Sequence, residues 1–114
     1  MTVKARSIIR PAIRPAIRPI VISDTAAIVD LETSLFSSAL NAQQLTHLLQ
    51  HQTFFGLVLE IAPKIVGYVL ATHIIDQAEI ISFGISPDHQ GCGLGDKLLT
   101  RCLHDLAAAN AHDT

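Results

Sequence analysis

A glycine-rich stretch in the second half of the chain contains the residues best suited to hold a ligand. It reads Gln90-Gly91-Cys92-Gly93-Leu94-Gly95 and lies between a β-rich run and a stretch with helical periodicity. Glycine lets the backbone turn tightly and present its N–H groups. The first N–H groups of a helix have no acceptor within the helix and lie at the positive end of its dipole. The stretch is therefore suited to bind a diphosphate, and a plain glycine turn between strand and helix is the alternative.

Two common nucleotide-binding motifs do not fit this stretch. A Walker A loop ends in Gly-Lys-Ser or Gly-Lys-Thr, whereas Gly95 is followed by Asp96 and Lys97. A dinucleotide fingerprint has the spacing G-x-G-x-x-G after a first strand. The spacing here is G-x-G-x-G, and the preceding strands are predicted to form a meander, so both classes of site are excluded.

The elements that must position the glycine loop can be predicted from periodicity and turn residues. Capping residues at 23–24 precede one helix, and Asn41 with Gln44 three residues later predicts a capped second helix. Three β-rich runs follow, the first two of which read as a hairpin. A third helix is predicted from Gly95 onward. The β-rich runs cover 54–61, 65–75 and 78–85.

The N-terminal part is a short tandem repeat in which Ile-Arg-Pro recurs every four residues, at 9–11, 13–15 and 17–19. Proline at this spacing removes one backbone donor in four and blocks both a helix interior and a central strand. We therefore expect an extended arm over 1–16, followed by a first strand over 17–22. A low-complexity extension is favoured over a basic arm that touches an acidic surface such as RNA.

Composition restricts the possible classes of protein. A chain of 114 residues has the length of one domain, and 49% hydrophobic with 16% charged residues excludes a disordered chain. The net charge is −2 and no basic stripe follows the repeat, so DNA is not expected as a partner. The sequence contains no run of 18 apolar residues, so no membrane span is predicted. The two cysteines suggest free thiols in a reducing compartment, and a cytoplasmic location is expected.

Residues 85–95, ISPDHQGCGLG, resemble motif A of the GNAT superfamily of N-acetyltransferases, which has an apolar strand end, a proline and then Q-x-x-G-x-G. Residues 78–90 are similar to the ribosomal-protein alanine N-acetyltransferases (the RimI type) within that superfamily. The resemblance implies an α/β (α+β) acyl-CoA N-acyltransferase fold with a mostly antiparallel sheet. Residues 17–114 would form the N-terminal and acetyl-CoA-binding part of that domain.

The resemblance also implies which residues bind acetyl-CoA. Backbone groups at the end of the fourth family strand would pair with the pantetheine arm, and loop amides would hold the pyrophosphate. Two departures from the family pattern predict weaker phosphate binding: Gly91 stands where Arg or Lys is usual, and Asp96 stands where a basic residue is common. Each lost charge-assisted contact is worth about 1.5–3 kcal/mol. The implied cofactor residues are Phe83, Gly84, Ile85, Gln90, Gly91, Cys92, Gly93, Leu94, Gly95 and Asp96.

Glu79, eleven residues before Gln90, is the candidate catalytic residue. In several GNAT enzymes a glutamate at this place removes a proton from the substrate amine, often through water. Burial that raises the pKa of a carboxylate toward neutrality would suit it to this role. The alternative is a surface glutamate at the start of a strand.

Five other side chains that could take part in chemistry are expected to have structural or surface roles instead. His47 and His51 are four apart on a predicted helix and could meet one metal ion, but no third ligand is near, so no metal is expected. His89 is expected to be exposed and Tyr68 to be packed. Cys92 lies at a helix N-terminus, which can lower a thiol pKa, but without a Cys-His-Asn arrangement it is expected to be a loop residue.

The expected activity is transfer of acetyl from acetyl-CoA to a primary amine, with the N-terminal alanine of a ribosomal protein as the favoured acceptor. A small-molecule amine and a non-catalytic fragment that binds CoA weakly are the alternatives. Family members continue past this helix with three more strands and another helix, so the chain is expected to be C-terminally truncated. Its fourth family strand would then be an exposed apolar edge capable of self-association.

Overall fold

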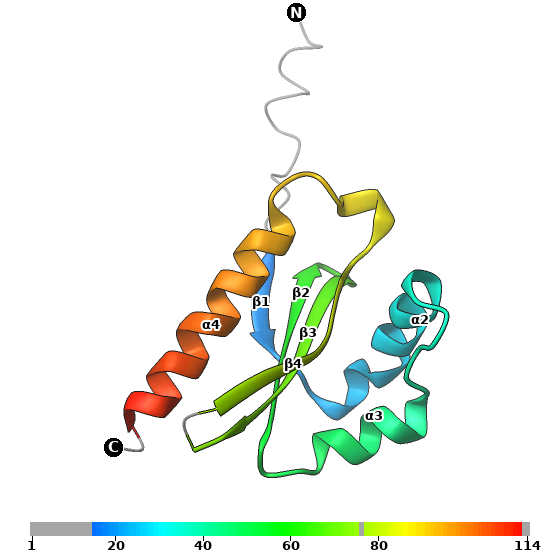
Figure 1. Ribbon diagram of the computed structural model, residues 1–114. Coiled ribbons are helices and arrows are strands. Elements are labelled where there is room, and N and C mark those ends of the chain that lie inside the picture. Colours follow the sequence, from blue (N-terminus) through cyan, green and yellow to red (C-terminus); the bar gives the residue numbers. More distant parts are fainter. Residues whose placement is uncertain (1–14, 76, 113–114) are drawn as a thin grey trace, which may run out of the picture.

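The computed structural model describes residues 15–75 and 77–112 and contains one antiparallel sheet between two helical layers (Figure 1). The strand order is β1-β2-β3-β4, so neighbours in the sheet are also neighbours in sequence. Helix α4 covers one face, and α2 and α3 cover the other. This architecture confirms the predicted α/β class. The elements are β1 (Ala16–Pro19), the 3-10 helix η1 (Ile22–Asp24), α2 (Thr25–Leu35), α3 (Ala42–Leu49), β2 (Phe54–Ile61), β3 (Lys64–Ile74), β4 (Gln77–Ile85), the 3-10 helix η2 (Pro87–His89) and α4 (Leu94–His112).

Alternation along the strands divides the apolar core into two clusters. Along β2, Leu57 and Leu59 pack toward α4, whereas Val58 packs toward α2 and α3. Two bulges interrupt the alternation: one adds Val66 to β3 and the other adds Ile81 to β4. Each bulge changes which residues of its strand face α4, and the second lies in the strand that leads into the glycine loop.

The predicted helix starts are confirmed, and the α3 capping box is formed as expected. The Gln44 N–H donates to Asn41 Oδ1 at 2.8 Å, and the Asn41 N–H donates to Gln44 Oε1 at 2.9 Å. These two bonds satisfy backbone donors that a helix start leaves free. The helices over 25–35 and 42–49 therefore follow from local sequence signals.

The first strand differs from the predicted span of 17–22, because β1 begins at Ala16 and ends at Pro19. The Ile20 N–H still donates to the Gly56 carbonyl of β2 at 3.1 Å, but the Val21 N–H turns away from β2 and donates to Asp24 Oδ2 at 2.9 Å. That bond turns the chain into η1 two residues after the strand ends. The first repeats, and most of the arm expected over 1–16, lie outside the described residues.

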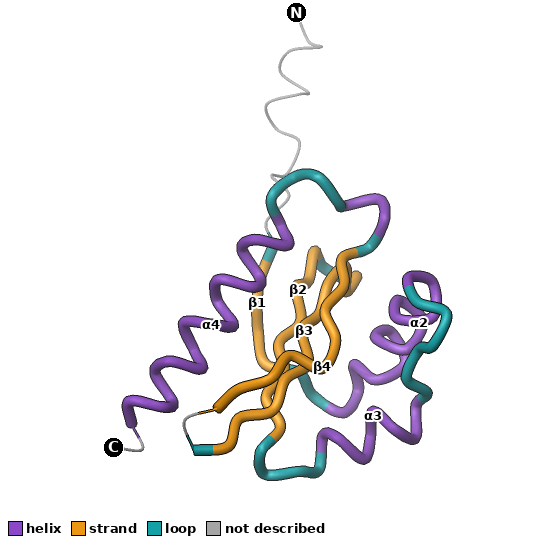
Figure 2. The backbone as a smooth tube through the Cα atoms, viewed as in Figure 1, coloured by secondary structure: helices purple, strands orange, loops and turns teal. Residues whose placement is uncertain are grey.

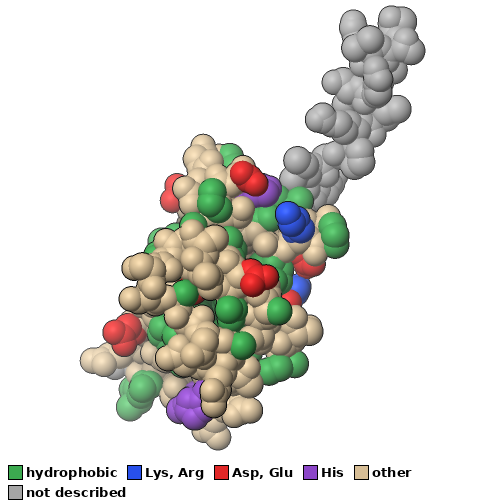
Figure 3. Space-filling view, turned by 90° about the vertical axis from the view of Figure 1, so that its right-hand side faces the viewer, with side chains coloured by type: hydrophobic (Ala, Val, Ile, Leu, Met, Phe, Trp, Pro, Cys, Tyr) green, Lys and Arg blue, Asp and Glu red, His purple; other side chains and the backbone are tan. Residues whose placement is uncertain are grey.

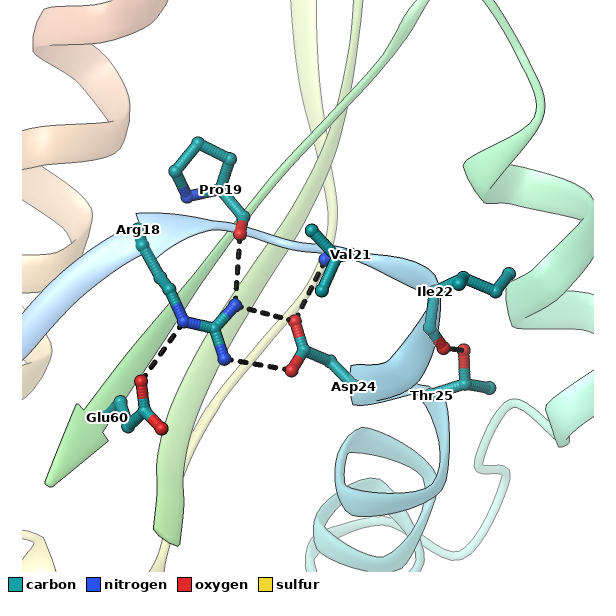
Figure 4. Close-up of polar contacts among 7 residues, drawn as sticks. All are labelled: Arg18, Pro19, Val21, Ile22, Asp24, Thr25 and Glu60. Carbon is teal, nitrogen blue, oxygen red and sulfur yellow. Dashed lines mark hydrogen bonds and ion pairs between the residues drawn. The ribbon is translucent and has the colours of Figure 1, made fainter. Parts of the chain in front are cut away.

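Arg18 of the third repeat joins β1 to α2 (Figure 4). Its guanidinium donates to both Asp24 oxygens at 2.8 and 2.9 Å and to Glu60 Oε1 at 3.1 Å. The hydrogen bonds from Arg18 hold the pKa of the Asp24 carboxyl below its usual value, even though burial acts in the opposite direction. This arginine therefore has a structural role within the sheet.

Charged side chains are scattered over the face that α2 and α3 form (Figure 3). Acidic, basic and histidine side chains lie there among hydrophobic and uncharged ones, with no broad basic area on the side shown. A large basic area is what nucleic-acid backbones select. Within residues 15–75 and 77–112, no helix combines the length and the apolar composition needed to cross a membrane.

Candidate cofactor-binding site

The connection from β4 to α4 passes through η2 (Figure 2). It also contains two glycines in unusual conformations. Gly91 and Gly93 have φ values of +81° and +83°, in the region that residues with a side chain rarely adopt. The Lys97 N–H donates to the Gly93 carbonyl at 3.2 Å and so begins the α4 hydrogen bonding. The N–H groups before Lys97 in this turn therefore precede the first intrahelical bond and are available to an anion.

A cavity of about 370 Å³ lies where the end of β4 meets this loop. Two apolar side chains of the α2 region, Leu35 and Phe36, form one wall. The Gln90 side chain ties the loop to the strand, because its Nε2 donates to the Ile85 carbonyl at 2.9 Å. Six residues predicted from the sequence line the cavity: Phe83, Gly84, Ile85, Gln90, Gly91 and Gly95.

The other four predicted cofactor residues lie in the same turn but do not line this cavity. Leu94, the first residue of α4, is buried in the core, whereas Cys92, Gly93 and Asp96 are exposed around the start of the helix. The Cys92 thiol donates to the His89 carbonyl at 2.9 Å, so it supports the turn as a loop residue. The structure thus brings all ten predicted residues to one end of the molecule, six of them around one cavity.

Gly84 lies where a larger residue would not fit. A Cβ atom built on it would lie 2.6 Å from Leu35 Cδ1 and 3.0 Å from both Tyr68 Cε2 and Tyr68 Oη. Gly95 is different, because its Cβ would meet Phe83 and Ile85 at ordinary contact distances of 3.5 and 3.6 Å. The absence of a side chain at Gly84 therefore lets α2 and Tyr68 approach the strand beside the cavity.

Glu79 lies away from the cavity, toward the other end of β4. It is exposed and lines a separate hollow with Thr72, its partner in β3. The register places it on the α2/α3 face, the face that Ser82 and Gly84 also occupy. At a strand rise of about 3.3 Å per residue, Glu79 is roughly 15 Å along β4 from Gly84.

A buried polar cluster lies between α2 and the sheet, and no sequence pattern predicted it. Glu32 of α2 is only 4% exposed and accepts hydrogen bonds from the hydroxyls of Tyr68 and Ser82, the latter at 2.6 Å. Burial, and then the hydrogen bond to Glu32, raise the pKa of Tyr68 above its usual value, so its hydroxyl stays protonated. Tyr68 is fully buried, which confirms that it is packed.

The remaining candidates also have definite places. His47 and His51 face each other on the surface of the α3 region, with their Nε2 atoms 3.4 Å apart. In the described ranges, no three His, Cys, Asp or Glu side chains are grouped as metal ligands. Both cysteines are free thiols, and burial raises the pKa of the Cys102 thiol. His89 is half-buried, not exposed as expected, and lies in η2.

The sequence match agrees with this geometry. A sequence model of the acetyltransferase (GNAT) family matches residues 25–113, which include the sheet from β2 onward, the glycine loop and α4. The chain belongs to the GNAT acetyltransferase family. No curated protein matches the GNAT chain closely enough to count as a relative.

Solved structures of GNAT acetyltransferases share the fold. The ribosomal-protein-S18-alanine N-acetyltransferase of Escherichia coli superposes with a TM-score of 0.76 at 19% identity, over 82% of this chain and 59% of that one. A GNAT family N-acetyltransferase of Escherichia coli in complex with CoA gives 0.73 at 23% identity, over 84% and 58%. An aminoglycoside acetyltransferase from an uncultured soil sample gives 0.72 at 20% identity, over 84% and 72%. The chain therefore spans about three fifths of the two Escherichia coli proteins and is similar to enzymes with different acceptors.

Proposed function

We propose that this chain forms the cofactor-binding part of an enzyme that transfers acetyl from acetyl-CoA to a primary amine, with a protein N-terminal alanine as the favoured acceptor. The observation that carries the proposal is the cavity where the edge strand β4 meets the glycine loop. An edge strand has backbone groups without a strand partner, and an extended amide chain can pair with them. The pantetheine arm of acetyl-CoA is such a chain.

The described residues fit the two ends of this cofactor. The turn at Gly91 and Gly93 offers N–H groups to a diphosphate, while the apolar walls from Leu35, Phe36 and Phe83 suit the arm and exclude water. With the diphosphate at the loop, the arm would run back along β4 from Ile85 toward Phe83. Bound acetyl-CoA would supply an acetyl thioester at that end, beside Ser82.

We further propose Glu79 as the group that takes a proton from the acceptor amine. It shares a sheet face with Ser82, because the bulge adds one residue between them, and their partners in β3, Thr72 and Leu70, are two residues apart. That separation is roughly 7 Å at the usual strand rise, so Glu79 would act through water between them. Its exposure in its own hollow gives water access to the carboxylate.

Two alternatives remain for the acceptor and the activity. A small-molecule amine would use the same cofactor cavity, and the similarity in fold to an aminoglycoside acetyltransferase favours keeping this candidate. A non-catalytic chain that binds CoA only weakly is supported by the exposed Asp96 carboxylate at the start of α4 and by the missing cation at Gly91. Both features lower the affinity for a diphosphate.

Calorimetric titration with acetyl-CoA tests the proposal by opposite charge changes in the same turn. Gly93→Asp puts an anion and a strained backbone at the turn and should weaken binding by at least about tenfold. Asp96→Lys replaces an anion with a cation and should strengthen binding by about tenfold. Asp105→Lys makes the same charge change about 14 Å further along α4, beyond the screening length, and should leave the affinity unchanged.

Three results would count against cofactor binding at this loop. They are a wild-type chain with no measurable affinity for acetyl-CoA, equal affinity in wild type and Gly93→Asp, and equal strengthening by Asp96→Lys and Asp105→Lys. The last result would mean that net charge, and not the loop, sets the affinity. Acetyl transfer to an alanine-ending peptide and to a small amine then decides between the two acceptors.

A further inference from the structure

A buried carboxylate without a cationic partner lies under β4. Glu32 accepts hydrogen bonds from Tyr68, from Ser82 Oγ at 2.6 Å and from the Leu40 N–H at 3.2 Å. Over the described part of the chain, the ion pairs involve Asp24, Glu60 and Asp105, and none includes Glu32. A charge removed from water and left unpaired is costly, so the region favours a positive charge nearby.

The cluster forms part of the wall of a second hollow, which adjoins the cofactor cavity. This hollow has a volume of about 540 Å³, and Glu32 and Ser82 are among its lining residues. Phe36 and Phe83 line both the hollow and the cofactor cavity, so the two lie next to each other on β4. The hollow therefore begins where the acetyl end of the cofactor would lie.

The direction of the hydrogen bonds fixes what Ser82 can offer to a ligand. A serine hydroxyl has one proton to donate and two lone pairs to accept. Ser82 gives its proton to Glu32, and Tyr68 also gives its proton to Glu32. The half-buried Ser82 oxygen can therefore only accept from the hollow, which selects a donor such as an amine over a carbonyl.

We propose that Ser82, oriented by Glu32, accepts a hydrogen bond from the amino group of the acceptor, and that the Glu32 charge makes this hollow select a singly charged amine. The inference rests on the proposed function for the identity of the reaction, but the binding preference stands on the hollow itself. Besides Glu32 and Ser82, the hollow is lined by Ser37 and Ser38 and by four apolar residues, Phe36, Ile80, Ile81 and Phe83. The apolar residues suit a small apolar body, as in an N-terminal residue, and offer nothing to the further charges of a polycation.

The first test compares ligands on the unchanged protein. Binding is followed by nuclear magnetic resonance titration, with and without desulfo-CoA, which carries no reactive thiol. The probes are a peptide that begins with alanine, the same peptide with propionyl in place of alanyl, and sisomicin as a polycationic aminoglycoside. The alanyl peptide should bind at least about tenfold more tightly than the propionyl peptide. Equal affinities for the two peptides, or tighter binding of sisomicin, would overturn the inference.

The second test uses variants with a matched control in the same hollow. Ser82→Ala and Glu32→Gln should each weaken binding of the alanyl peptide by at least about tenfold. Neither variant should change the affinity for the propionyl peptide. Ser37→Ala removes another hydroxyl from the hollow, one without a hydrogen bond to Glu32, and should leave the affinity for both peptides unchanged. If Ser82→Ala weakens binding of both peptides equally, Ser82 has a structural role, and the inference is contradicted. Titration with CoA is run on every variant, so a failure of cofactor binding is seen separately from a failure of amine selection.

Discussion

Gly84 and Gly95 differ in what a methyl group would meet, and this makes them a matched pair. The Cβ of Gly84→Ala would lie 2.6 Å from Leu35, which is closer than real Cβ contacts, and at a tight 3.0 Å from Tyr68. We therefore expect a loss of about 1–3 kcal/mol in unfolding free energy and weaker acetyl-CoA binding. Gly95→Ala makes ordinary contacts within α4, where alanine is the better helix former, so stability should be unchanged or rise by up to about 1 kcal/mol. Urea unfolding measures both. Equal stability of the two variants would show that Gly84 does not hold α2 against the strand.

Glu79 and Glu32 have different proposed roles, and kinetics separates them. Glu79→Gln should lower kcat for acetyl transfer by about 100-fold, because a proton acceptor typically contributes that much or more. The KM for acetyl-CoA should stay the same, since Glu79 does not line the cofactor cavity. Gln77→Ala, in the same hollow, is the control and should leave kcat unchanged. An unchanged kcat in Glu79→Gln would remove this residue from the reaction.

The sequence predicted the glycine loop because its signal is local. Gly91, Gly93 and Gly95 lie within five positions, and their spacing after a strand and before a helix already implies the turn. Glu32 and Ser82 stand 50 residues apart in the sequence and belong to α2 and β4. No local pattern links a helix glutamate to a strand serine, so only the packed fold shows that they meet.

At the scale of elements, the joint between β1 and α2 depends on the Arg18–Asp24 pair. Asp24→Asn removes the charge from a side chain that is 6% exposed, while Arg18 is 34% exposed and partly hydrated. We therefore expect a loss of only about 1–2 kcal/mol in unfolding free energy, less than for a fully buried pair. The control is Asp105→Asn in the exposed Arg101–Asp105 pair, which should cost less than about 0.5 kcal/mol.

The same pair predicts a direction for the pH dependence. Because Arg18 lowers the pKa of Asp24 in the folded state, the pair contributes its stability above the unfolded pKa of about 3.9 and loses it as pH falls through the lower folded value. The difference between wild type and Asp24→Asn should thus be constant between about pH 5 and 8 and shrink below about pH 4. Urea unfolding at a series of pH values measures it. A difference that grows on acidification would contradict the assigned pairing.

Element boundaries followed the sequence wherever the stop signal was local. The strand over 54–61 was predicted to the residue, and Asn41 with Gln44 marked the start of α3. The predicted end of β1 was wrong, because the apolar residues after Pro19 suggested a longer strand. What ends it is the Asp24 carboxylate, which takes the Val21 N–H and is itself fixed by Arg18. That arrangement forms only when β1 and η1 have both folded and lie next to each other, so no local sequence signal predicts it.

At the scale of the whole molecule, β4 orders the candidate chemistry along one edge of the sheet. From the start of the strand onward, the Glu79 hollow comes first, then the hollow with Glu32 and Ser82, and then the cofactor cavity. The α2/α3 layer contributes Glu32, Leu35 and Phe36, while α4 supplies the helix N-terminus on the other face. Neither layer alone makes a site, so the proposed activity depends on the sheet between them.

The edge position of β4 also predicts self-association. It pairs only with β3 in the described sheet, and its residues Ile80 and Ile81 are 40% and 39% exposed. Two such edges can pair about a two-fold axis and extend the sheet, so we expect a concentration-dependent dimer in sedimentation velocity. Ile80→Lys should weaken the dimer by about tenfold or more, because a charge on an edge strand opposes pairing. Ile22→Lys places the same charge at a side chain that is 60% exposed in η1 and should have no effect.

The proposed cofactor site adds a second readout for the dimer, since the pantetheine arm would use the same backbone edge. Saturating CoA should then shift the wild type toward monomer, and a monomer at all concentrations, or a dimer indifferent to Ile80→Lys, would contradict pairing through β4.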